Sequence, residues 1–125
     1  MNDCKIKAIV LEPGKVARVT EIESRWSAME EVVQGDLEAI YPFDDPVCIV
    51  CNGNGKNARL PLCRVLFGSE HKIRDIICGP AFICGFNEDG LTSLDDSLID
   101  KYLARFLHPE CLLSWEMERR RFHNS

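Results

Sequence analysis

Polar and apolar residues alternate at the start of the chain and then give way to a short apolar run. In CKIKAIVLEPGKVARVTEI, residues 4–22, lysines alternate with apolar residues before Ile9, Val10 and Leu11. The segment EPGK follows, with proline in second place and glycine in third place, an order that favours a tight turn. Apolar residues continue beyond that turn. The pattern predicts a β-hairpin over residues 4–22.

The next segment, ESRWSAMEEVVQG, carries apolar residues at the spacing of a helix. Trp26, Met29 and Val33 would lie on one face of that helix. Ser24 is placed to cap its N-terminus, and Gly35 stands where a C-terminal capping glycine belongs. The stretch DLEAIYPF after it predicts a short strand.

Three apolar runs follow in the middle of the chain. VCIVC, residues 47–51, lies between a proline and the turn-forming NGNG, which predicts a buried strand. ARLPLCRVLF fits either a loop with one helical turn or a short strand. IRDIICGPAFICGF predicts a strand that the pair Gly79–Pro80 interrupts with a bulge or a bend.

The clearest helix pattern of the chain is TSLDDSLIDKYLARFLHP, residues 92–109. Thr92 or Ser93 can cap it, and Arg105 lies near its C-terminal end, where a positive charge is favourable. Its apolar stripe consists of Ile99, Leu103 and Phe106. The order of elements predicts an α+β fold, a mostly antiparallel sheet of about five strands with two to three helices packed on it. We expect one domain over residues 1–125, in which 109–125 form a C-terminal helical tail.

Composition and charge mainly exclude classes of function. The formal net charge is −5, which argues against non-specific binding to nucleic acid because such binding needs a basic surface. No apolar run approaches the roughly 20 residues of a membrane-spanning helix, so we expect no membrane segment. The start MNDCKIKAIVLEPGK does not have the pattern of a signal peptide, and a cytoplasmic location follows as the expectation.

The stretch CIVCNGNG raises the question of a zinc site, because its spacing matches the repeat of the zinc-binding domain of J-protein chaperones. Zinc needs four ligands, whereas the chain has one C-x-x-C pair among its seven cysteines. On an extended strand, Cys48 and Cys51 would point to opposite faces and could not share a metal ion. A homo-oligomer could complete the site by symmetry, so that alternative stays open. We expect no metal and no cofactor.

Most of the cysteines are expected to pack as small apolar side chains in a reducing compartment. Those with apolar neighbours within two residues are Cys4, Cys48, Cys78, Cys84 and Cys111.

Two segments are candidate binding sites. Asn52, Lys56, Arg59 and Arg64 surround the glycine-rich turn and could form a small anion-binding patch, because glycine amides and arginine suit phosphate or carboxylate. The alternative is that these are solvated loop residues and that Arg64 caps a short helix. Near the C-terminus, aromatic and basic residues interleave in a way that suits docking on a partner or on a symmetry mate. The partner-binding candidates there are Trp115, Arg119, Arg120 and Arg121.

The order of these motifs resembles the domain-of-unknown-function family numbered 3846. The resemblance is carried by IKAIVLEPGKVARVTEI, by CIVCNGNGK followed by LPLCRVL, by IICGPAFICGF and by LTSLDDSLIDKYLARF, over about residues 5 to 107. The family turn CN-x-x-GK is matched by Cys51, Asn52, Gly55 and Lys56. The family often has Asn-Arg after its Leu-Pro, and here Cys63 stands in the place of that asparagine. The resemblance implies a small α+β domain of phages, plasmids and integrative elements.

The sequence contains no Ser/His/Asp order and no standard nucleotide-cradling loop. We therefore expect a small non-enzymatic interaction protein of a phage or mobile element, acting in counter-defence by binding a host protein. The alternative is a protein that sequesters a small anionic ligand, such as a signalling nucleotide.

Overall fold

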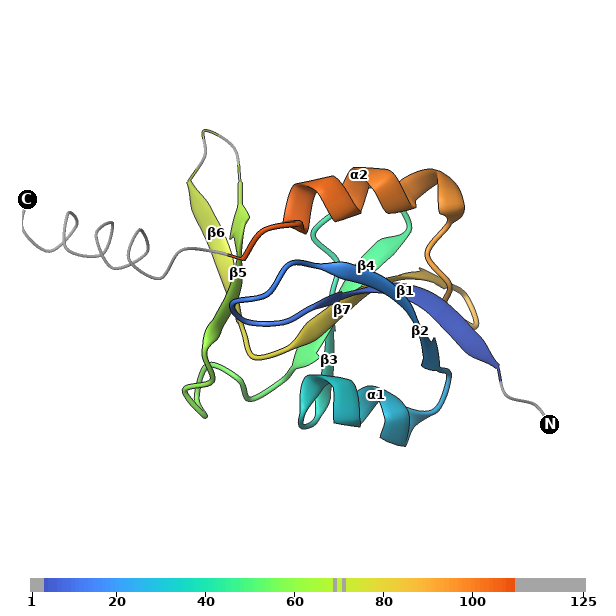
Figure 1. Ribbon diagram of the computed structural model, residues 1–125, viewed down its shortest axis with the longest axis horizontal. Helices are drawn as coiled ribbons and strands as arrows, with labels where there is room; N and C mark the ends of the chain where they lie inside the picture. Colours follow the sequence, from blue (N-terminus) through green and yellow to red (C-terminus); the bar gives the residue numbers. More distant parts are fainter. Residues whose placement is uncertain (1–3, 69, 71, 110–125) are drawn as a thin grey trace, which may run out of the picture.

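The fold consists of a six-stranded antiparallel sheet, a separate two-stranded sheet and two helices, in the computed structural model that describes residues 4–68, 70 and 72–109 (Figure 1). Along the main sheet the strands run in the order β2-β1-β7-β4-β3, and β8 pairs with β7. The elements are β1 Lys5–Leu11, β2 Arg18–Glu23, α1 Trp26–Val33, β3 Leu37–Ile40, β4 Val47–Asn52, β5 Leu62–Phe67, β6 Ile73–Cys78, β7 Ala81–Asn87, β8 Gly90–Thr92 and α2 Asp96–Phe106. The predicted α+β class is confirmed, with more strands than expected and two helices.

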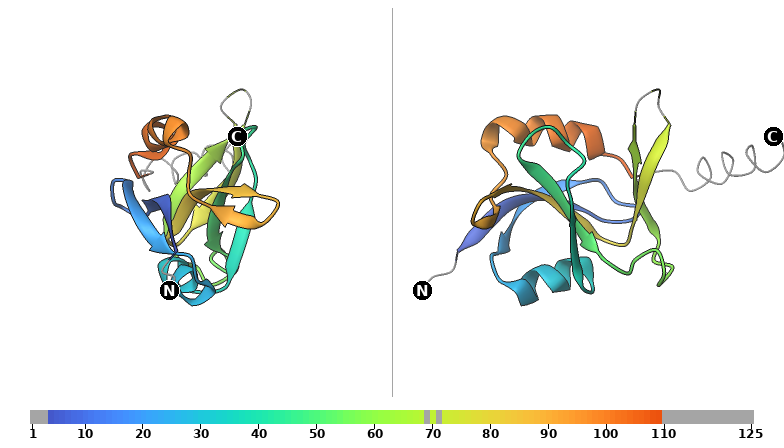
Figure 2. Two further views of the ribbon diagram at one scale, coloured as in Figure 1. Left: turned by 90° about the vertical axis from the view of Figure 1, so that its right-hand side faces the viewer. Right: turned by 180° about the vertical axis from the view of Figure 1, so that it is seen from behind.

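The two helices cover opposite faces of the main sheet, so that the sheet is the middle one of three layers (Figures 1 and 2). Side chains alternate between the faces along each strand. On β1, Ala8 and Val10 point to the α1 side, while Ile9 and Leu11 point to the α2 side. β4 and β7 lie in the interior of the sheet, which explains why their sequences are almost continuously apolar.

The predicted hairpin at the start of the chain is confirmed as β1 and β2, which pair from Lys5 opposite Glu23 to Val10 opposite Arg18. Gly14 has a φ of 73°, the conformation that the turn requires of its third residue. The amide of Lys15 donates to the carbonyl of Glu12 at 3.2 Å and closes the turn.

The predicted boundaries of α1 were wrong at both ends. Ser24 does not cap the helix, because it stands one residue before the N-cap position, where its amide donates to the carbonyl of Cys4. The residue before the helix is Arg25, which makes no side-chain cap. Gln34, and not Gly35, adopts the left-handed conformation at the end. Gly35 is needed for space instead, since a Cβ atom there would overlap the side-chain amide of Asn52.

The face predicted for α1 is partly correct. Met29 and Val33 are buried, but the Trp26 side chain is 67% exposed. Trp26 is the first residue of the helix and therefore lies at its edge.

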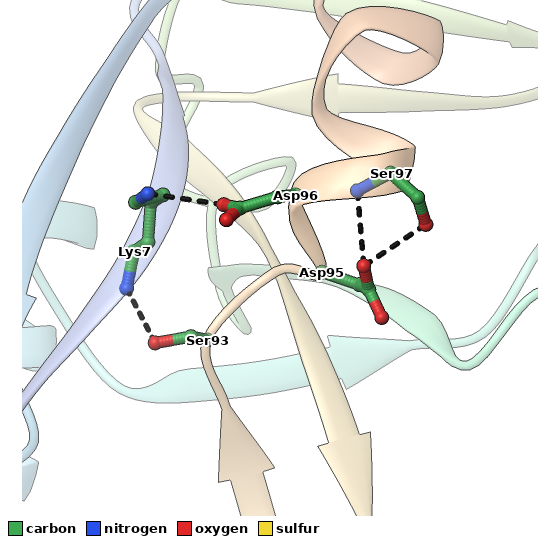
Figure 3. A network of polar contacts seen from close by, with 5 residues as sticks. All are labelled: Lys7, Ser93, Asp95, Asp96 and Ser97. Atoms are coloured by element: carbon green, nitrogen blue, oxygen red, sulfur yellow. Dashed lines mark hydrogen bonds and ion pairs between the residues drawn. The ribbon is translucent and has the colours of Figure 1, made fainter.

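The predicted N-terminal cap of α2 was also wrong, because Asp95 caps the helix in place of Thr92 or Ser93 (Figure 3). The Asp95 carboxylate accepts hydrogen bonds from the amide and the hydroxyl of Ser97, both at 2.9 Å. Ser93 is occupied elsewhere, since its hydroxyl accepts from the amide of Lys7 on β1 at 2.9 Å. Arg105 lies in the last turn of α2 as expected.

The stretch IRDIICGPAFICGF is two strands in two different sheets, and the expectation of one interrupted strand was wrong. β6 ends at Cys78 and pairs with β5, whereas β7 starts at Ala81 in the main sheet. Gly79, with a φ of 85°, makes the change of direction between them. The ambiguous run ARLPLCRVLF contains β5 and is therefore a strand.

Neither helix among the described residues is both long and apolar enough to span a bilayer.

Candidate functional site

The glycine-rich turn after β4 joins three parts of the fold through Asn52. The side-chain amide of Asn52 donates to the carbonyls of Val33 and Gln34, at 3.2 and 3.0 Å, at the end of α1. The side-chain oxygen accepts from the amide of Asn54 at 2.8 Å and shapes the turn. Gly55 packs against the carbonyl of Cys78 so closely that a Cβ atom would overlap it. Asn52 thus holds the turn, β4 and α1 together.

The same turn borders a pocket of about 160 Å³. Its lining includes Asn52 and Lys56 from the predicted patch, together with Glu38 and Cys78 from two flanking strands. The Lys56 ammonium forms an ion pair with Asp75, and the hydrogen bond of that pair raises the pKa of Lys56. The positive charge beside this pocket is therefore balanced by the carboxylate of Asp75.

Arg64 lies apart from this pocket, in the interior. Its side chain is 1% exposed, and its guanidinium donates to main-chain carbonyls. The carbonyl of Phe106, at the end of α2, accepts from Nε at 2.9 Å. The carbonyl of Lys15 accepts from Nη2 at 2.9 Å, and that of Cys63 accepts from Nη1 at 2.8 Å. Arg64 therefore links β5, the turn of the first hairpin and the end of α2.

The four residues of the predicted anion patch consequently do not share one surface. Asn52 and Lys56 line the same pocket, Arg59 is exposed at a position with a φ of 58°, and Arg64 is buried. The alternative interpretation of Arg64 as a solvated residue is wrong as well, although Arg64 does bind one carbonyl at the end of a helix, that of Phe106. Arg64 is buried because both faces of β5 are covered, and the four consecutive residues from Cys63 to Leu66 are all buried.

A larger hollow of about 470 Å³ lies between the first hairpin and α1. Its apolar floor includes Val10 and Ile22, and its rim is mostly acidic. The charged residues of the lining are Lys5, Glu12, Arg18, Glu21, Glu23 and Glu31. It runs beside β2, which pairs with β1 alone among the described strands and forms an edge of the main sheet. Sequence reasoning missed this site, although the charged residues of β2 are typical of an edge strand.

A second cluster that sequence reasoning missed is centred on Asp45. Its carboxylate accepts from the hydroxyl of Tyr102 and from the ammonium of Lys101, both at 2.7 Å. The hydrogen bonds from Lys101 and Tyr102 lower the pKa of Asp45, while burial raises the pKa of Tyr102 to about 12. Local sequence patterns do not reveal this cluster, since residues 56 and 57 positions away supply the partners of Asp45. The cluster fastens α2 to the segment before β4.

Cys48 and Cys51 lie on opposite faces of β4, as predicted for a strand. Cys48, Cys51, Cys63 and Cys84 are buried, Cys78 is half-buried, and Cys4 is exposed, contrary to the packing expected for it. The single interrupted strand expected for IRDIICGPAFICGF would have held both Cys78 and Cys84, but the two cysteines belong to different sheets. Within the described part of the chain, no group of three or more metal-binding side chains is assembled.

Several candidates near the C-terminus lie outside the described residues. They are Cys111, Trp115, Arg119, Arg120 and Arg121, together with residues 110–125 of the expected helical tail.

Comparison with known proteins gives one match. The family described as "Domain of unknown function (DUF3846)" matches residues 6–107 of the chain. No curated protein and no solved structure matches it.

Proposed function

We propose, from the premise that the chain belongs to the DUF3846 family, that this protein is a non-enzymatic interaction protein of a phage or another mobile element. It acts in counter-defence by binding a protein of the host cell. The observation that carries the proposal is the open edge of the main sheet at β2, with the hollow of about 470 Å³ beside it.

An edge strand can bind an extended segment of another protein, because its outer main-chain groups can form one more strand ladder. β2 offers six residues for such pairing, which is a common length for a strand. The hollow beside it can take side chains of the added strand in its apolar floor.

The charge of the lining selects the partner. Four glutamates face one lysine and one arginine around the hollow. Glu12 is engaged by Arg18 at 3.3 Å, and Glu23 by Arg25 at 2.7 Å. Glu21 and Glu31 add negative charge along the rim. The partner segment is therefore an extended stretch with basic and apolar side chains.

Charge reversal tests this surface. The double variant Glu21→Lys/Glu31→Lys should lose the bound host protein, whereas Glu88→Lys/Asp89→Lys makes the same change of charge in the exposed turn between β7 and β8. Quantitative mass spectrometry of proteins retained from a host lysate would name the protein that only the rim variant loses. Binding of that purified protein is then measured by calorimetry. Equal retention by both variants, or turnover of a metabolite in an activity screen, would overturn the proposal.

A second candidate is binding of a small anionic ligand, which is favoured by the pocket at the Asn52 turn. Its donors would be Lys56 and the amides of the turn, without the buried Arg64. A thermal shift by a signalling nucleotide that Lys56→Ala abolishes, and that Lys72→Ala preserves, would support this alternative. The absence of a shift with the native protein would remove it.

A further inference from the structure

Two cysteines face each other in the centre of the main sheet. Cys48 on β4 and Cys84 on β7 are directly opposite in the antiparallel register, and their sulfur atoms are 3.9 Å apart. Both side chains are fully buried and belong to the apolar cluster on the α1 face. Among the described residues four thiols are buried, and these two are the pair that the strand register joins.

The backbone of such a pair is compatible with a disulfide. Residues directly opposite in an antiparallel ladder have Cα atoms about 4.5 or 5.5 Å apart, depending on the position in the ladder. Both spacings lie within the range of roughly 4.4–6.8 Å that disulfides use. The Cβ atoms of facing residues are usually somewhat farther apart than those of a relaxed disulfide, so the bond would be strained and readily reduced.

We propose that Cys48 and Cys84 are a reversible oxidation site, a cross-strand dithiol that peroxide converts into a disulfide when α1 opens. In the first step one of the two sulfur atoms attacks one oxygen of the peroxide and becomes a sulfenic acid, while the other oxygen leaves as water or an alcohol. The sulfur of the second cysteine then attacks the sulfenic sulfur, and water leaves. The two thiols lose two electrons and two protons, which the peroxide takes up.

The surroundings favour this pair over the other buried thiols. The sulfur atoms of Cys48 and Cys84 are in contact, and either of them can donate to the other. By contrast, burial raises the pKa of Cys51 to about 11 and that of Cys63 to about 12, and neither of them faces a second cysteine in the register of the described strands.

Access to the pair depends on α1. Met29 and Val33 of this helix pack in the same apolar cluster as the two cysteines. The helix has eight residues and no side-chain cap at its start, and Asn52 binds its last carbonyls. Local opening of such an element costs less free energy than global unfolding.

The first test uses the wild-type protein without any substitution. Reduced protein is treated with hydrogen peroxide, denatured and alkylated, and its intact mass and peptides are measured. We expect the loss of two hydrogen masses, five alkylated cysteines out of seven, and a peptide link between Cys48 and Cys84. A dithiol reductant should restore all seven. A link between other cysteines, or seven alkylated cysteines after oxidation, would overturn the proposal.

Variants test the pair and the route. After oxidation of Cys84→Ala, Cys48 should no longer be protected from alkylation by a disulfide. In Cys51→Ala, whose substitution lies on the other face of the sheet, Cys48 and Cys84 should still be protected. Asn52→Ala should speed up the oxidation of the pair roughly tenfold, as expected when opening becomes about 1.4 kcal/mol easier. An unchanged rate in Asn52→Ala would overturn the assignment of α1 as the gate. If Cys84→Ala fails to fold, the peptide map of the wild-type protein still decides whether the pair forms a disulfide.

Discussion

The two helices cover opposite faces of one sheet, yet they are attached to it in different ways. α2 is fastened by polar contacts at its start, its middle and its end. Asp96 pairs with Lys7 at 3.0 Å, Tyr102 donates to Asp45, and the carbonyl of Phe106 accepts from buried Arg64 (Figure 3 shows the first of these). In addition, the amide of Ala17 donates a hydrogen bond to the carbonyl of Leu107, just after α2.

α1 is attached mainly by apolar packing. Met29 and Val33 enter the core, Trp26 stays exposed, and the polar anchor at the end of the helix is Asn52. Apolar packing stabilises a position without fixing it as narrowly as directed hydrogen bonds do. The α1 side also holds the hollow beside β2 and the facing pair of cysteines. The face covered by α1, which has fewer polar contacts to its helix, is therefore the face that carries both the proposed partner-binding surface and the proposed oxidation site.

The largest effect on stability should come from removing the buried hydrogen bonds that Arg64 makes at the end of α2. Arg64→Ala leaves three main-chain carbonyls, two of them in buried hydrogen bonds, without this donor, which we expect to lower the free energy of unfolding by about 4 kcal/mol. Arg59→Ala, at an exposed position, should change it by less than about 0.5 kcal/mol. Urea denaturation followed by fluorescence measures both. Similar stabilities for the two variants would show that the buried guanidinium does not hold the α2 side together.

Removal of the polar anchor of α1 should have a smaller and more local effect. Asn52→Ala loses two hydrogen bonds to the end of the helix, and we expect a cost of about 1.4 kcal/mol. Hydrogen exchange should become faster in α1 while α2 keeps its protection. Asn57→Ala, in the exposed part of the same turn, serves as the control. Equal acceleration in both helices would contradict the idea that the two faces open separately.

The middle contact of α2 offers a test by pH. Tyr102→Phe removes the hydrogen bond to Asp45 and should cost about 1 kcal/mol at neutral pH. Burial, and then the bond to Asp45, raise the pKa of Tyr102 from 10.0 to about 12. Between these values the unfolded chain loses the phenolic proton before the folded chain does, so wild-type stability falls as the pH rises. The difference between wild type and Tyr102→Phe should therefore shrink from pH 10 to pH 12. A stability difference that stays constant over this pH range would contradict a buried Tyr102 hydroxyl bonded to Asp45.

The smallest effect is expected at the start of α2. Asp96→Ala removes the exposed ion pair with Lys7 and should cost at most about 0.5 kcal/mol, because water and salt screen such pairs. Asp95→Ala, which removes the neighbouring cap, should cost about 1 kcal/mol. Thermal unfolding at low and high salt separates the two effects. At high salt, only the Asp96 variant should become as stable as the wild-type protein. The reverse order would mean that the ion pair, and not the cap, fixes the start of α2.

Local patterns in the sequence determined much of the fold. Alternation of polar and apolar residues, with a proline and a glycine at the turn, predicted the first hairpin. Continuous apolar residues predicted the buried strand β4 and placed Cys48 and Cys51 on opposite faces. These features depend on neighbours a few residues apart, and so the sequence alone contains them. The helix ends were predicted less well, because Ser24 stands one residue before the N-cap position and the hydroxyl of Ser93 is bonded to the distant strand β1.

Only the tertiary structure decided the partners across the fold. The inward direction of Arg64, the bond between Tyr102 and Asp45 and the meeting of Cys48 with Cys84 each join residues at least 36 positions apart. Such contacts depend on the order of strands in the sheet and on the register between them, which local patterns leave open. The sequence therefore determined which segments are buried, and the folded chain decided what each buried polar or sulfur atom faces.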